Sequence, residues 1–214
     1  GLAVVLMSTK MSDYLLVRLL YELCAIYRVE SYRHKSPALT TVKRLKEELN
    51  LLSGIRGTER VQALLDYVAD CSRSPRETDL AMLAWLPHRM GGYGLPLGTM
   101  NKTCRLRGVV RRCDLLFPKV EGLPRVGVEY ESDEEHSGDE NISSDSARRK
   151  VFENNGYRIV TFTNGELKSA VLSFEAMRNI GTCLGLRVRR PRGYNAKMRD
   201  ALLAFVNTEH VPLF

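Results

Sequence analysis

The sequence predicts an α/β fold, in which a mixed sheet flanked by helices follows a small helical N-terminal region. Leucines recur at helical spacing before residue 70, and three short apolar runs, at 109–117, 125–130 and 157–162, have the length and composition of strands. Helical patterns separate and follow these runs, which is typical of a layered α/β domain. With 214 residues and 44% hydrophobic content, the chain can bury one elaborated core or two small ones.

Residues 1–71 are expected to form the helical region. The leucines of residues 11–27 lie on one face of a helix. Ser36 and Pro37 have the order of an N-cap and a first-turn proline, so a second helix is predicted from there to Leu52. A third apolar stripe follows Gly57. These stripes indicate a packed core.

Residues 72–186 are expected to form the α/β domain. Ser74, Pro75 and Glu77 have the spacing of a capping box that opens a helix. The glycine-rich turn at 91–94 lacks the Lys-Ser/Thr of a phosphate loop, so it is interpreted as a bend. The runs 109–117 and 125–130 then predict a hairpin, followed by a helix over 142–155, a strand over 157–162 and a helix over 166–184.

Three acidic residues lie on the two strands of this hairpin. Glu129 and Glu131 are two residues apart and therefore project from the same face of a strand. Asp114 lies on the neighbouring strand. Converging carboxylates favour a hard-cation site, so Asp114, Glu129 and Glu131 are predicted to bind Mg²⁺ or Mn²⁺.

The distribution of charge favours DNA as a partner. Residues 126–147 hold eight acids and no lysine or arginine, so the rest of the chain carries 32 basic residues against 17 acids. A basic body around an acidic island is typical of a polyanion-binding surface that holds a cation, although a solvated acidic loop would have the same composition. Residues 187–214 form a basic C-terminal extension, expected either to contact phosphates or to be a solvated tail. Its first part contains six basic residues, Arg187, Arg189, Arg190, Arg192, Lys197 and Arg199.

The cysteines and apolar runs favour the cytoplasm. Five cysteines, widely spaced and never in a Cys-x-x-Cys pair, argue for free thiols in a reducing compartment. The apolar runs are too short to cross a bilayer, and the first residues lack the order of a secretory signal. We therefore expect a cytoplasmic protein without membrane contact.

Several elements in this order resemble a known family. They are Ser74-Pro75-Arg76-Glu77, Asp114-Leu-Leu-Phe-Pro, Val128-Glu129-Tyr130-Glu131, His136, Asp145-x-x-Arg148 and Gly156-Tyr-Arg-Ile-Val-Thr. Over about residues 72–184 the chain resembles the very-short-patch-repair-like branch of the PD-(D/E)XK nuclease superfamily, in particular the endonuclease-like domains known as DUF559.

The resemblance implies a restriction-endonuclease-like fold and metal-assisted hydrolysis of phosphodiester bonds. By position, Asp114 and Glu129 would be metal ligands, and Glu77 would be an accessory carboxylate. Glu131 stands where many members have a lysine that orients the attacking water, and a glutamate can act there only as a further ligand or a base. His136 could take the proton of that water, or it could be an ordinary loop histidine.

Purely structural roles are also compatible with these residues. Glu77 could simply close its capping box. Asp145 and Arg148 have the spacing of a helix cap with an i,i+3 pair, and Lys150 on the same helix could replace the missing lysine. Residues 133–144 resemble part of a calcium loop but lack the bidentate glutamate at its last position.

The sequence is compatible with three functions. The first is a Mg²⁺-dependent DNA endonuclease. The second is a catalytically inactive DNA-binding module with the nuclease fold, serving a toxin–antitoxin or phage-defence system. The third assigns partner contact or homodimer formation to the N-terminal helices.

Overall fold

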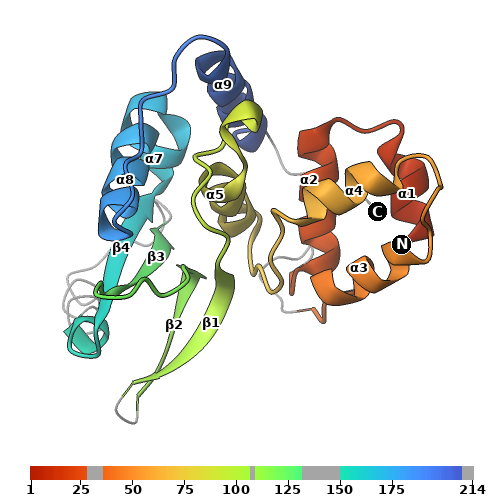
Figure 1. The fold of residues 1–214 in the computed structure, drawn as a ribbon. Coiled ribbons are helices and arrows are strands. Elements are labelled where there is room, and N and C mark those ends of the chain that lie inside the picture. The colour runs from red at the N-terminus through yellow and green to blue at the C-terminus, as the bar shows by residue number, and fades with distance from the viewer. Residues whose placement is uncertain (28–35, 107–108, 132–149, 209–214) are drawn as a thin grey trace. The chain divides into compact units, whose positions relative to one another are not determined.

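A computed structural model describes residues 1–27, 36–106, 109–131 and 150–208 of the chain (Figure 1). The chain forms two compact units, one built from Gly1–Met82 and the other from Leu83–Asn207. Helices α1–α5 precede a four-stranded mixed sheet that carries further helices. The predicted α/β class, with a helical region before the sheet, is confirmed at this level.

The first unit contains α1 (Leu2–Ser8), α2 (Asp13–Cys24), α3 (Val42–Asn50) and α4 (Thr58–Leu65). Helix α2 was predicted, but with a single apolar face; in the structure it is buried on all sides from Leu16 to Glu22. The predicted start of the second helix at Ser36 is wrong. That helix begins at Val42, because the Thr41 side chain accepts a hydrogen bond from the Arg44 amide and Asp70 accepts one from the Val42 amide. Helix α1 was not predicted.

Helix α5 (Pro75–Trp85) runs from the first unit into the second. The short 3₁₀ helix η2 (His88–Met90) follows it and ends at Gly91, whose φ of 80° requires a residue without a side chain. The glycine-rich segment is therefore a bend, as predicted.

The second unit is organised on a sheet of strand order β1-β2-β3-β4. Its strands are β1 (Thr99–Leu106), β2 (Val109–Leu116), β3 (Arg125–Glu131) and β4 (Tyr157–Thr163). The pairs β1–β2 and β2–β3 are antiparallel, and β3–β4 is parallel. Strand β1 was missed in the sequence, because its polar residues leave no continuous apolar run and no clean alternation.

The helices after β4 also differ from prediction. The helix expected over 166–184 is divided into α7 (Asn164–Lys168) and α8 (Ala170–Cys183), because Ser169 adopts an extended backbone and caps α8 with its side chain. Helix α9 (Tyr194–Val206) follows. Residues 150–153 are helical and represent the described end of the helix predicted before β4.

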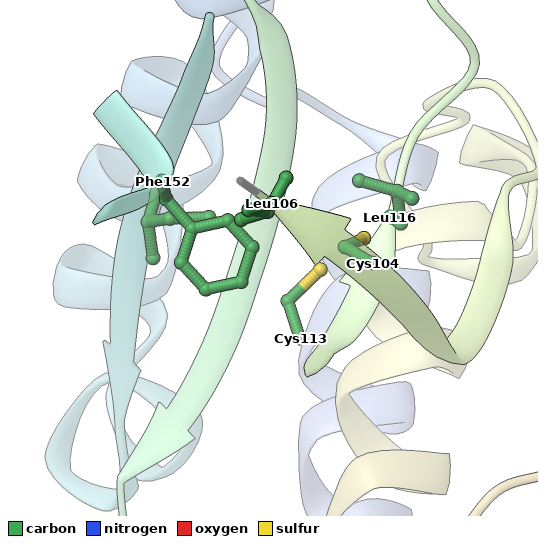
Figure 2. Packing of buried hydrophobic residues seen from close by; sticks show 6 residues of the cluster. Cys104, Leu106, Cys113, Leu116 and Phe152 are labelled. Atoms are coloured by element: carbon green, nitrogen blue, oxygen red, sulfur yellow. The ribbon is translucent and has the colours of Figure 1, made fainter. Parts of the chain in front are cut away.

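One face of the sheet carries a compact apolar cluster. It combines side chains of β1, β2, β4 and the helical residues 150–153 (Figure 2). The members are Cys104, Leu106, Cys113, Leu116, Phe152 and Ile159. Gly127 of β3 lies beneath this cluster, and a Cβ added there would stand 2.9 Å from Ile159 Cδ1 and 3.0 Å from Cys113 Sγ.

Candidate metal centre

Strands β2 and β3 bring Asp114 close to Glu129. The register pairs Leu115 with Val128 and Leu116 with Gly127, so its continuation by one residue places Asp114 opposite Glu129. Asp114 Oδ2 accepts a hydrogen bond of 2.7 Å from the backbone amide of Tyr130, the residue directly after Glu129. The Asp114 carboxylate is thus held against the Glu129–Tyr130 peptide, and both acidic residues are half-buried.

A break in the β1–β2 ladder accompanies this contact. The register pairs Met100 with Leu115 and then Lys102 with Cys113, passing over Asn101 and Asp114. Asn101 has a φ of 51°, in the left-handed region that asparagine tolerates better than most residues. On its other side, Asp114 accepts its hydrogen bond from the backbone of β3 directly beyond the last paired residues of β2 and β3.

Glu129 projects from the face of the sheet that carries the apolar cluster. Glu129 follows Gly127 by two residues, so the two residues face the same side of the strand. Side chains of the apolar cluster pack directly over Gly127 on that side. Burial, followed by the Cys104 thiol and the carboxylates of Glu129 and Asp114, raises the pKa of the Cys113 thiol to about 12. Both carboxylates thus act electrostatically on the same buried thiol, at the polar margin of the cluster.

Strand β4 and helix α7 support β3 from its other side. Thr161 pairs with Glu129 and Thr163 with Glu131 in the parallel ladder. On the opposite face, the Tyr130 hydroxyl donates a 3.1 Å hydrogen bond to Asn164 Oδ1. The Tyr130 side chain is tied down in this way, which helps to hold the Glu129 backbone in place.

Glu131 lies at the end of β3 and is half-buried. Alternation places it on the same strand face as Glu129. Within the described ranges, however, no three His, Cys, Asp or Glu side chains come together in a group that could hold a metal ion. The described part of the site is therefore a pair of carboxylates, Asp114 and Glu129, and the role of Glu131 as a third ligand remains a prediction. Mg²⁺ commonly uses only one or two protein carboxylates, with water and substrate phosphate supplying other ligands.

Glu77 has a clear local role in the first unit. Its backbone amide donates to Ser74 Oγ at 3.1 Å, and its Oε2 accepts from the Arg73 amide at 2.9 Å. The first hydrogen bond is the N-cap that the spacing predicted, and the second comes from the residue before Ser74 and not from the Ser74 amide of a regular capping box. The side chain is only 8% exposed. A part for Glu77 in a metal site remains a prediction.

Several predicted residues lie outside the described part of the chain. They are His136, Asp145, Arg148 and the calcium-loop-like residues 133–144. Lys150 is described and exposed, within the helical residues 150–153.

Arg199 corrects one expectation for the basic C-terminal extension. It is 4% exposed, donates hydrogen bonds to the carbonyls of Gly91 and Gly92, and places its guanidinium 3.4 Å from the centre of the Tyr93 ring. A side chain enclosed in this way cannot contact phosphate. It fastens α9 to the turn after η2, a role that no local sequence signal indicated.

No helix in the described ranges is long and apolar enough to cross a membrane. Comparison with models of known protein families, with curated proteins and with solved structures finds no match.

Proposed function

We propose that this chain is a metal-dependent endonuclease that hydrolyses phosphodiester bonds in DNA, with a restriction-endonuclease-like fold of the PD-(D/E)XK type. The observation that carries the proposal is the juxtaposition of Asp114 and Glu129 across β2 and β3, with Asp114 hydrogen-bonded to the peptide that follows Glu129. This is the pair of positions that the family resemblance selects as metal ligands.

The donor set fits Mg²⁺ or Mn²⁺. Both side chains supply hard oxygen ligands, and the hydrogen bond to Oδ2 orients the Asp114 carboxylate before a cation arrives. The buried cluster beside them lowers the local dielectric, which strengthens the attraction between the carboxylates and a cation. A bound divalent ion would polarise the scissile phosphate and ease deprotonation of the attacking water.

The remaining roles follow from residue chemistry. Asp114 and Glu129 hold the cation, and Glu131 stands next along the same face, where a carboxylate can bind or accept a proton. The basic excess of the chain attracts and holds the phosphate backbone of DNA.

A second function is favoured by one specific feature, the glutamate at 131 where many members of the family have lysine. Without a lysine side chain at position 131, the chain would bind DNA through the same scaffold but cleave it slowly or not at all. Salt-sensitive binding of DNA, without cleavage in Mg²⁺ or Mn²⁺, would support this non-catalytic module.

The decisive variant is Asp114→Asn. Alanine is a poor choice, because it would leave the Tyr130 amide without its carboxylate acceptor, at a cost of about 1–3 kcal/mol. Asparagine keeps an acceptor of the same shape and removes the charge. Cleavage of plasmid DNA in Mg²⁺ should fall on the order of a hundredfold or more.

Glu121→Gln is the matched control, because Glu121 is an exposed acid in the loop between the same two strands and loses the same charge. Its cleavage rate should equal that of the parent chain. Full cleavage by Asp114→Asn would reject the assignment of this carboxylate to the metal site.

A further inference from the structure

The C-terminal end of α8 turns back on itself in a defined way. Gly185 has a φ of 71°, its amide donates to the Thr182 carbonyl at 3.0 Å, and the Leu186 amide donates to the Gly181 carbonyl at 2.8 Å. These are the two hydrogen bonds of a Schellman motif, in which a glycine reverses the chain after the last helical turn. Residues 186–192 therefore leave the helix in a fixed direction.

A second glycine allows the returning segment to pack closely on α8. A Cβ added at Gly181 would stand 2.4 Å from Val188 Cγ2, so any larger residue would push the segment away. Val188 is half-buried while its neighbours Arg187 and Arg189 are exposed. The packing of one valine thus fixes the position of the arginines on either side of it.

The result is a basic pocket of about 710 Å³ between α8 and the returning segment. The described residues that line it include five arginines and no acid. The arginines are Arg178, Arg187, Arg189, Arg190 and Arg192, joined by Thr182, Leu186 and Val188. All five arginines are exposed.

Two of these arginines have partners among the residues that the structure describes. Arg178 forms an ion pair with Glu175, and the Arg190 guanidinium lies 5.9 Å from the centre of the Phe174 ring. No acid in the described ranges forms an ion pair with Arg187, Arg189 or Arg192. Guanidinium groups gathered around one pocket repel each other, and a polyanion relieves this repulsion.

The chemistry of the pocket selects phosphate in an extended ligand. Arginine binds phosphate oxygens through two parallel hydrogen bonds, which lysine cannot do. A small metabolite is normally enclosed over most of its surface, whereas here every arginine stays open to solvent. An open basic pocket with several guanidinium groups suits a polymer that presents successive phosphates as it passes.

We propose that the arginine pocket formed by α8 and residues 186–192 holds the phosphodiester backbone of a nucleic acid. The identity of the ligand rests on the proposed function, while the location rests on the pocket itself. None of its lining residues belongs to the carboxylate pair, so the contact positions the backbone and takes no part in bond cleavage.

The test combines two charge-neutralising variants of the full chain. One carries Arg187→Gln, Arg189→Gln and Arg192→Gln. The control carries Lys10→Gln, Lys43→Gln and Arg56→Gln. These substitutions remove the same amount of charge from three exposed basic residues of the first unit. Binding of a fluorescently labelled DNA duplex is measured by anisotropy over a range of salt concentrations, with EDTA present so that cleavage cannot occur. Circular dichroism verifies that both variants fold.

The pocket variant should bind DNA on the order of tenfold to a hundredfold more weakly, and its plot of log affinity against log salt should be shallower by about 3. The control should lose much less of both. Equal losses in the two variants would overturn the proposal, because only net charge would then matter. Unchanged DNA binding by the pocket variant would overturn it too, including the case in which the pocket takes up inorganic phosphate alone.

The same measurements distinguish failure of the pocket proposal from failure of the nuclease proposal. Weak DNA binding by the pocket variant, with no cleavage by any form in Mg²⁺, would support the pocket and reject the enzyme. Normal DNA binding by the pocket variant, with cleavage abolished by Asp114→Asn, would support the enzyme and reject the pocket.

Discussion

Replacement of Arg199 by methionine should destabilise the second unit by about 2–3 kcal/mol. The guanidinium donates to the Gly91 and Gly92 carbonyls and covers the Tyr93 ring. The Gly92 carbonyl also contacts His88 Nδ1, so the larger loss falls on Gly91, which is buried. Methionine fills similar space but donates no hydrogen bond.

The magnitude follows from three contributions. A buried carbonyl left without a donor costs about 1–3 kcal/mol. Loss of a partly desolvated cation–π contact with Tyr93 costs about 1–2 kcal/mol. Relief from burying a charged guanidinium offsets part of this cost, which leaves about 2–3 kcal/mol.

Urea denaturation followed by tryptophan fluorescence reports on the unfolding of the second unit of the chain, to which Arg199 belongs. Trp85 is the only tryptophan in the chain, belongs to the second unit, is buried, and lies edge-on to Phe117 at 6.3 Å. With a urea dependence of about 2 kcal/mol per molar, the midpoint should fall by about 1 M.

Lys197→Met is the matched control, because Lys197 is an exposed cation on the same helix. Its free energy of unfolding should stay within about 0.5 kcal/mol of that of the parent chain. If Arg199→Met unfolds at the same urea concentration as this control, the contacts of Arg199 do not stabilise the unit as argued.

Three further results are expected. Asp79→Ala should destabilise the first unit by about 3–5 kcal/mol, because the buried Arg18 loses a carboxylate 3.1 Å away; a melting curve by circular dichroism that is unchanged would contradict this. Gly127→Val should lower the free energy of unfolding, measured by urea denaturation and tryptophan fluorescence, by about 1–3 kcal/mol, since even a Cβ would lie 2.9 Å from a cluster side chain. An unaltered urea midpoint would refute the close packing. Cys71 and Cys183 should react with a thiol reagent in the folded chain, while the three buried cysteines should react only in denaturant; rapid reaction of all five would be incompatible with the fold.

Local patterns predicted most of the elements near the candidate site. Strands β2, β3 and β4 were found because short β-rich apolar runs lie between turn signals, and the Ser74 cap of α5 was found because Ser74 and Glu77 have fixed spacing. Both kinds of signal depend only on residues close in sequence. Strand β1 was not predicted, because its place in the sheet comes from pairing with β2 and not from its own composition.

The geometry of the site needed more than these patterns. Alternation predicted that Glu129 and Glu131 share a strand face, but it could not predict that Asp114 would hydrogen-bond to the Tyr130 amide. That contact depends on the β2–β3 register. Register is decided by pairing between strands, which a single run of residues does not specify.

Residue patterns alone were enough to predict the class of fold, most of the helices and strands, and which carboxylates share a hairpin, because burial along one segment leaves a period in its own residues. Which basic residues stay open to a ligand could be learned only from contacts between distant parts of the chain. Arg199 is enclosed by a turn 108 residues earlier in the chain, whereas Arg187 and Arg189 are exposed around a valine that packs on Gly181. Arginines in one charge run look alike in sequence, and contacts with distant residues alone separate a structural role from a binding one.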